Sequence, residues 1–307
     1  YSPLKGFMDK ATLECVLEKD VLPDGNIWTM PILLQLEKEQ SDNFEVGEEV
    51  ALADRTGVIH GKLTISDKFS LNLEQLASRW FSTKSEQHPG VFKLFKRGNI
   101  FLGGEIKYSK RPKLTTRSYQ LTPKETRFIF SHKGWSQVIG FHTRNPVHRG
   151  HEYIQKKALE ISGADGLFIN PVIGPKKRGD FKAEYIMKSY QTMLEFGLYP
   201  NGKVILGGFS TYSRYAGPRE AIFTALCRKN MGCSHFIIGR DHTGVGNFYP
   251  KGALGKLLDE IGDIGIELIF FPPIGYLPET NNYGEKSYNA AFRPIDGTTI
   301  RNTLSEG

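Results

Sequence analysis

The chain has 307 residues, of which 39% are hydrophobic and 24% are charged, values that are typical of a globular protein and exclude a disordered or fibrous one. No run reaches the roughly 18 apolar residues of a membrane span, so we expect none. The net charge of +7 favours anionic partners: nucleotides, oxyanions, nucleic acid or an acidic membrane surface. The three cysteines have no metal-ligand spacing, and we expect free thiols in a reducing cytoplasm.

Residues 1–118 are interpreted as a β-rich domain with its linker. Short apolar runs between Gly, Asp and Asn turns predict strands at 28–36, 48–54, 57–65 and 99–108, and 72–81 predicts a helix. The polar, proline-bearing stretch 109–126 predicts the linker. At its end, Thr122, Pro123 and Glu125 have the spacing of an N-cap, a first helical residue and a capping-box partner, so we expect a helix to begin there.

Residues 119–307 are interpreted as a Rossmann-like α/β domain with a parallel sheet. Continuous apolar runs predict strands at 137–141, 166–172, 203–209, 235–240 and 266–271. The segments between them predict helices at 149–162, 182–196, 217–231 and 253–262. In the first of these helices, Ile154, Ala158 and Ile161 fall at helical spacing, so we expect all three to face inward. Ligands of such sheets bind beyond the carboxyl ends of the strands, where every polar motif of this half falls.

The stretch GFHTRNPVHRGHE, residues 140–152, joins the first of these strands to the first helix. His148 and His151 are three residues apart, so both can reach one face of the first helical turn. A helix N-terminus has unpaired N–H groups and a positive dipole end, which favours a bound phosphate. A metal site and structurally satisfied histidines stay open as alternatives. The metal alternative lacks the usual four-residue spacing and a third ligand, so we expect phosphate binding and no metal site.

The element HRGH after a strand resembles the HxGH signature of the nucleotidyltransferase superfamily. The surrounding TRNPVHRGHE is similar to the ATP sulfurylase motif Q-T-R-N-P-x-H-R-x-H-E. Four further segments are similar to motifs of that family in the same order: YSPLKGFM (1–8), NPVIGPKKRGD (170–180), RYAGPREAIFTALCRKNMGCSHFIIGRDHTGVG (214–246) and DGTTIRNTL (296–304). The resemblance covers essentially the whole chain. It implies a PUA-like fold for the first domain and a nucleotidyltransferase fold for the second.

The resemblance implies transfer of an adenylyl group from ATP to sulfate, giving adenylyl sulfate and pyrophosphate, with Mg²⁺ accompanying the ATP. Attack on the α-phosphorus needs positioned cations and N–H donors rather than a covalent nucleophile. The residues implied at the catalytic centre are Thr143, Arg144, Asn145, His148, His151 and Arg240. The residues implied to contact the nucleotide are His148, His151, Gly239, Arg240, His242, Gly244 and Thr298. A helix N-cap stays open as the alternative role of Thr298.

Two positions of the implied oxyanion pocket depart from the family pattern. Arg144 matches the family's arginine, whereas His142 stands in place of a glutamine and Thr243 in place of an alanine. A neutral His142 can donate one hydrogen bond and Thr243 adds a hydroxyl, so sulfate binding stays physically allowed. Because a site that hydrogen-bonds its substrate discriminates strongly, an oxyanion acceptor other than sulfate is the alternative.

A third hypothesis is RNA binding through the basic first domain, since PUA-like folds also bind RNA. We rank it lower, because no basic stripe interleaved with aromatic residues stands out there. The resemblance also implies a homo-oligomer. It implies further residues on both sides of this chain, among which a fused kinase-type domain stays open. The physiological direction of the reversible reaction does not follow from the sequence.

Overall fold

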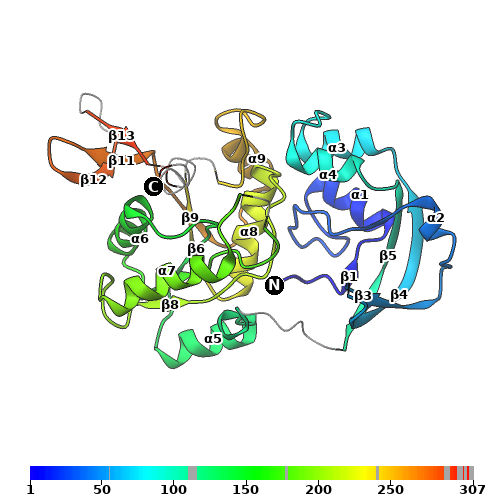
Figure 1. Cartoon of the computed structure of the whole chain (residues 1–307), viewed down its shortest axis with the longest axis horizontal. Coiled ribbons are helices and arrows are strands. Elements are labelled where there is room, and N and C mark those ends of the chain that lie inside the picture. Colours follow the sequence, from blue (N-terminus) through cyan, green and yellow to red (C-terminus); the bar gives the residue numbers. More distant parts are fainter. Residues whose placement is uncertain are drawn as a thin grey trace.

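The computed structural model describes residues 1–54, 56–109, 116–176, 179–239, 242–286 and 291–295, together with 300 and 303. An antiparallel sheet lies at one end of the molecule and a parallel sheet with its helices at the other, and helix α8 (Pro218–Asn230) stands between them (Figure 1). Within the described ranges, no helix has the length and apolar character needed to cross a membrane.

The N-terminal half is built on an antiparallel sheet in the order β1-β5-β4-β3, with β2 also pairing with β5. Its strands are β1 (Gly6–Phe7), β2 (Leu34–Leu36), β3 (Glu49–Ala53), β4 (Ile59–Ser70) and β5 (Ile100–Tyr108). Its helices are α1 (Lys10–Lys19), α2 (Lys38–Ser41), α3 (Leu73–Phe81) and α4 (Pro89–Phe95). The β-rich architecture, three of the four predicted strands and the helix predicted at 72–81 are therefore confirmed.

The strand predicted at 28–36 is wrong over most of its length, since only Leu34–Leu36 pairs with a neighbour. Pro31 has no N–H to donate to a ladder. The carbonyl of Met30 accepts a hydrogen bond from the indole N–H of Trp28 at 2.7 Å. This carbonyl is therefore paired with a side chain rather than with a neighbouring strand. Trp28 and Met30 are both buried in the core. Apolar character here marks packing rather than sheet.

The C-terminal half contains the predicted parallel sheet, in the order β10-β9-β6-β7-β8. Its strands are β6 (Val138–Phe141), β7 (Gly166–Ile169), β8 (Val204–Leu206), β9 (His235–Ile238) and β10 (Glu267–Phe270). Its helices are α5 (Pro123–His132), α6 (Arg149–Ser162), α7 (Ala183–Glu195), α8 and α9 (Ala253–Ile261), preceded by the short 3-10 helix η1 (Arg117–Tyr119). An antiparallel sheet of β11 (Ile274–Leu277), β12 (Asn282–Glu285) and β13 (Arg293–Pro294), which the sequence did not indicate, lies beside α6 (Figure 1).

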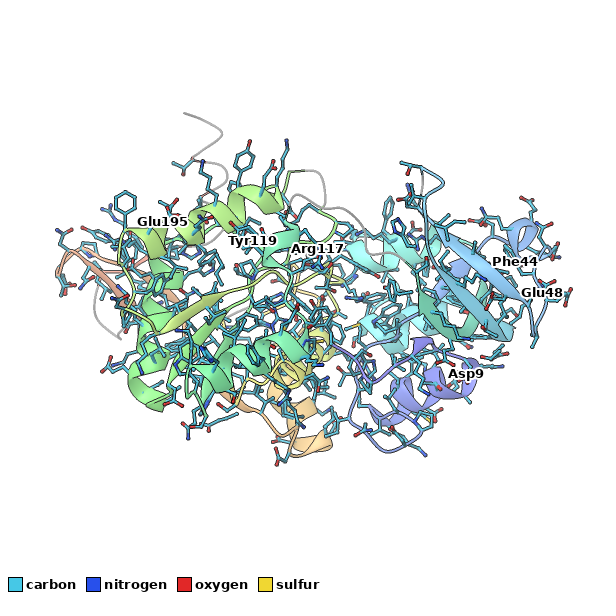
Figure 2. The ribbon with its side chains drawn as sticks, turned by 90° about the horizontal axis from the view of Figure 1, so that it is seen from below. Asp9, Phe44, Glu48, Arg117, Tyr119 and Glu195 are labelled. Carbon is cyan, nitrogen blue, oxygen red and sulfur yellow. The ribbon has the colours of Figure 1, made fainter. Side chains whose placement is uncertain are left out.

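Local capping explains where two of the helices begin. The carboxylate of Asp9 accepts a hydrogen bond from the backbone N–H of Thr12 at 2.7 Å and caps the N-terminus of α1. Figure 2 shows Asp9 in the N-terminal half, at the opposite end of the molecule from Tyr119 and Glu195. The predicted capping box of α5 is present: Glu125 Oε2 accepts from Thr122 N at 2.6 Å, and Thr122 Oγ1 accepts from Glu125 N at 3.3 Å.

The amphipathic face of α6 is shorter than predicted. Ile154 and Ala158 are buried, as expected, but Ile161 is 56% exposed. Ile161 lies in the last turn of α6, one residue before its final residue Ser162. Helical spacing places a side chain on a face, but burial also requires an element that covers that turn.

One hydrophobic core joins the two halves. Trp28 packs edge-to-face against Phe223 of α8, with ring centroids 5.3 Å apart, and Phe209 and Cys227 belong to the same cluster as Leu13 of α1. Arg219, also on α8, forms an ion pair with Asp20. It also donates to the carbonyls of Val16 and Leu17 in the last turns of α1, at 3.1 and 3.0 Å. Helix α8 is therefore a shared wall of both halves.

Candidate functional site

The loop between β6 and α6 carries the predicted histidine pair. His148 is the N-cap of α6, and its Nδ1 accepts a hydrogen bond from His151 N at 3.3 Å. The two imidazole rings stack with centroids 3.7 Å apart. Because Nδ1 of His148 is an acceptor, a neutral His148 ring carries its proton on Nε2.

His151 lies behind His148 rather than beside it. Its Nδ1 is 3.1 Å from the hydroxyl of Tyr190, which is fully buried, and Phe141 packs edge-on against its ring. Burial, followed by the neighbouring His148, holds the pKa of His151 well below its usual value. His151 is therefore neutral, and it supports the ring of His148.

Thr143 and Asn145 form a turn that positions Arg144. The buried Thr143 accepts a hydrogen bond from Asn145 N at 3.1 Å on its Oγ1, and its carbonyl accepts from Val172 N at 2.8 Å. These contacts tie the loop to the segment that follows β7. Arg144 is partly exposed, and its guanidinium carbon lies 5.0 Å from the centre of the Tyr215 ring.

Tyr215 has a left-handed backbone, with φ +64°, which is costly for a residue other than glycine. Its carbonyl accepts hydrogen bonds from Tyr249 Oη at 2.8 Å and from Nε2 of His88 at 2.9 Å. The buried carboxylate of Glu220 accepts from Arg214 N at 2.9 Å and from Ala216 N at 3.0 Å, on either side of Tyr215. The ring beneath Arg144 is therefore held in place by a strained but well-anchored turn.

His88, which belongs to the N-terminal half, was not expected from the sequence to serve the site. It is fully buried, and its Nδ1 accepts from the N–H groups of Gly90 and Val91 at 3.1 and 3.3 Å as the N-cap of α4. Its proton is therefore on Nε2, which donates to the Tyr215 carbonyl. Burial lowers the pKa of His88, so the ring stays neutral.

His142, in the glutamine position, contacts a buried arginine. Arg228 of α8 is fully buried, and its Nη2 lies 2.9 Å from Nδ1 of His142. His242 is nearby, with ring centroids 5.3 Å apart, and its Nε2 lies 3.0 Å from Thr224 Oγ1. Burial, followed by Arg228, holds the pKa of His142 well below its usual value; burial also lowers the pKa of His242, to about 3.

Lys176, which the sequence did not single out, lies near His142 and Arg144. Its ammonium donates to the carbonyl of Val172 at 2.6 Å, after β7. Burial lowers its pKa to about 8; Asp180 opposes the shift and Arg144 adds to it. The charges of Lys176 and Arg144 both depress the pKa of His142, because the three groups lie near one another. The signal available in the sequence was its place in the segment 170–180.

Thr243 has φ +61°, and its hydroxyl donates to the carbonyl of Gly217 at 2.8 Å, so in this arrangement it offers an oxyanion a lone pair rather than a proton. Gly246 needs its glycine for a φ of +51°, whereas a Cβ at Gly239 would meet open space. Gly244 is partly buried in the same loop. Arg240 and Thr298 lie outside the described residues.

Acidic, histidine and cysteine side chains do not gather into a metal centre in the described part of the chain, where no three of them form a group that could hold an ion. The arrangement instead presents cations and N–H donors at the carboxyl end of β6, the central strand of the sheet. Such an arrangement binds a polyanion and stabilises negative charge that develops on it.

A helix N-terminus bearing histidines at the carboxyl end of a parallel strand is the arrangement of an α/β protein that binds phosphate groups. The family model for ATP-sulfurylase matches residues 117–307, and that for a PUA-like domain matches residues 1–111. The chain belongs to the ATP sulfurylase family.

Known proteins are similar along the whole chain. The sulfate adenylyltransferase of Symbiobacterium thermophilum is 39% identical over 316 residues, which cover 100% of this chain and 79% of that protein. That of Pyrococcus abyssi is 41% identical over 314 residues, covering 100% and 80%. The solved structure of a hexameric APS kinase from Thiobacillus denitrificans aligns with a TM-score of 0.75 and 22% identity, covering 99% of this chain and 54% of that one, which supports the fold.

Proposed function

We propose that the chain is a sulfate adenylyltransferase. A sulfate oxygen attacks the α-phosphorus of ATP; the new O–P bond forms as the bond from that phosphorus to the β-phosphate oxygen breaks, giving adenylyl sulfate and pyrophosphate. The observation that carries the proposal is the loop between β6 and α6, which presents Arg144 and the His148 N-cap together. The family membership and the names of the relatives support the same activity.

The residues divide the work by charge. His148 and the first N–H groups of α6 hold the phosphates, with His151 stacked behind as a neutral support. Arg144 neutralises charge that develops between the oxyanion and the α-phosphoryl group, a role that needs the fixed position given by Tyr215. Thr143 and Asn145 set the geometry of that turn.

We further assign the glycine-rich segment after β9 to the nucleotide. Its proposed contacts are Gly239, Arg240, His242 and Gly244, with Thr298 from the C-terminal segment. The hydroxyl of Thr224 lies 2.9 Å from the Ala221 carbonyl and 3.0 Å from Nε2 of His242, so Thr224 holds the orientation of the His242 ring. Mg²⁺ enters as part of the substrate MgATP, since Mg²⁺ is commonly held by substrate phosphates.

The test is pyrophosphate release from MgATP with sulfate, selenate, molybdate or phosphate as the second substrate. We expect release with sulfate and selenate and none with phosphate. Release with molybdate as well would mean that the pocket also accepts a larger tetrahedral dianion. Absence of release with sulfate, under conditions where a relative turns over, would reject the proposal.

A second candidate keeps adenylyl transfer and changes the acceptor. It is favoured by one observation, the pair of altered positions His142 and Thr243. The variant His142→Gln separates the two readings: sulfate use should be preserved or improved if sulfate is the acceptor. If the variant destroys a stronger activity toward another oxyanion, the second candidate is correct.

We also propose a homo-oligomer, as the family resemblance implies. Light scattering of the purified chain should give a mass that is a multiple of 34.6 kDa, and a monomer mass at all concentrations would contradict it.

A further inference from the structure

Arg228 is a buried cation without a carboxylate partner in the described part of the chain. Its guanidinium donates to the carbonyls of Asn170 at 2.8 Å and Thr224 at 3.3 Å, and to Nδ1 of His142 at 2.9 Å. The Nε atom has no hydrogen-bond partner. A buried charge surrounded only by neutral groups is costly, so its retention needs a reason.

The fold makes room for this side chain. The guanidinium lies 4.0 Å from the centre of the Phe209 ring and 5.7 Å from that of Phe236. Position 140 of the central strand is glycine, and a Cβ there would lie 2.8 Å from Cγ of Arg228. The side chain of Arg228 therefore crosses β6 at Gly140 with its guanidinium stacked on Phe209, which fixes its position. The guanidinium then contacts His142, just after the carboxyl end of β6.

The contact determines which nitrogen of His142 carries the proton. Guanidinium is a donor only, so Nδ1 of His142 must be a lone pair and the single proton of the neutral ring is on Nε2. An imidazolium would place an N–H against the guanidinium. A glutamine amide in the same position, by contrast, could turn and present either its NH₂ group or its oxygen.

We propose that Arg228 is a positioning residue that locks His142 as a donor to the acceptor oxyanion. This inference rests on the proposed function and deepens it. The oxyanion would receive the Nε2–H of His142, and the positive charge of Arg228 behind the ring would strengthen that donor. The bound dianion would in turn supply the counter-charge that Arg228 lacks among the described residues.

The lock has a consequence for specificity. Sulfate and selenate are dianions whose four oxygens are all acceptors near neutral pH, whereas phosphate at this charge carries one hydroxyl that must donate. A His142 that only donates has no lone pair for that hydroxyl, and an unmatched polar group is strongly penalised. The site should therefore reject hydrogenphosphate more strictly than one with glutamine in this position.

The other charged and titratable groups around His142 reinforce the lock. Arg228 approaches from α8, His242 from the loop after β9, Lys176 from the segment after β7 and Arg144 from the same loop as His142. None of them is anionic, and the positive charges of Arg228, Lys176 and Arg144 oppose a second proton on the ring. His142 should stay neutral throughout the pH range in which the enzyme is folded.

The direct test is the ¹⁵N NMR spectrum of the His142 ring in the full chain, assigned by comparison with His142→Gln. We expect an unprotonated Nδ1 and a protonated Nε2 from about pH 5.5 to about pH 8.5, a range that spans the ordinary histidine pKa. A proton on Nδ1, or titration of the ring near its ordinary pKa, would overturn the proposal. The spectrum requires no turnover, so it is decided separately from the proposed function.

The second test measures competition by phosphate and by selenate against sulfate, at about pH 7.5, in the wild type, Arg228→Met and His142→Gln. Both variants release the donor-only constraint, so the preference for selenate over phosphate should fall by about tenfold, equivalent to roughly 1.4 kcal/mol. A preference within twofold of the wild type in His142→Gln would refute the proposal even if Arg228→Met fails to fold.

The matched control is Arg127→Met. Arg127 of α5 also donates to two backbone carbonyls, those of Asn230 at 3.0 Å and Lys229 at 2.9 Å, but it makes no contact with His142. Its loss should leave both the ring spectrum and the anion preference unchanged. An equal change of preference in this control would assign the effect to packing of α8 and contradict a specific role for Arg228.

Discussion

His88 has two functions, because its Nδ1 caps α4 and its Nε2 donates to the Tyr215 carbonyl. Two replacements of His88 together separate these functions. His88→Ala removes both, together with the ring that packs 4.9 Å from Phe81 and 5.0 Å from Phe248. His88→Asn is a control of the cap, since asparagine is a good N-cap residue but is too short to reach Tyr215.

The magnitudes follow from the contacts. The cap contributes about 1 kcal/mol and the hydrogen bond to the Tyr215 carbonyl about 1 kcal/mol. The vacated ring volume adds about 1 to 2 kcal/mol, so His88→Ala should lose about 3 to 4 kcal/mol of unfolding free energy. His88→Asn should lose about 1 kcal/mol less than that, because the cap is kept.

Turnover should respond differently from stability. Both variants remove one of the two hydrogen bonds to the Tyr215 carbonyl and leave that of Tyr249. A left-handed residue costs about 1 to 2 kcal/mol, so loss of one anchor lets Tyr215 relax and Arg144 shift. We expect kcat/KM for sulfate to fall by about tenfold in both. The assays are urea unfolding and pyrophosphate release, and wild-type kcat/KM in His88→Asn would refute the reasoning.

Three further outcomes are expected. Arg144→Ala should lower pyrophosphate release at least ~100-fold with an almost unchanged melting temperature, and undiminished release would reject the site assignment. Gly140→Ala should cost about 1 to 3 kcal/mol in urea unfolding, because the new Cβ meets Arg228; an unchanged midpoint would mean that the guanidinium is not fixed there. The pKa of Lys176 is about 8, so its positive charge is present below that pH and lost above it. KM for sulfate should therefore rise through about pH 8 in the wild type and stay flat in Lys176→Met. A rise that persists in the variant would mean that another group titrates.

Much of the fold follows from local pattern, and its exceptions have local causes. Alternating apolar runs and helical segments predicted the parallel sheet, and the spacing of Thr122 and Glu125 predicted the start of α5. The strand expected around Trp28 failed because hydrophobicity does not distinguish packing from pairing. The prediction that Ile161 faces inward was wrong, because helical periodicity does not show how far along the helix a covering element extends.

The candidate site was less accessible to sequence reasoning. Motifs indicated the loop of Arg144 and His148 because its residues are contiguous. Contacts such as Arg228 with His142, 86 positions apart, and His88 with Tyr215, 127 positions apart, depend on how the chain closes on itself. Arg228 lies within the motif segment 214–246, but the motif does not show which side chain the guanidinium meets, and His88 precedes a proline with no motif around it.

The core shared by the two halves bears on how the chain folds as it is made. Domains generally fold in order of synthesis, the N-terminal one first. Here the cluster around Trp28 and Leu13 is completed by Phe209, Phe223 and Cys227. The first half therefore leaves the ribosome with an open apolar face that is covered only when α8 emerges. Until then that face is exposed to solvent, and transiently exposed apolar surface favours aggregation.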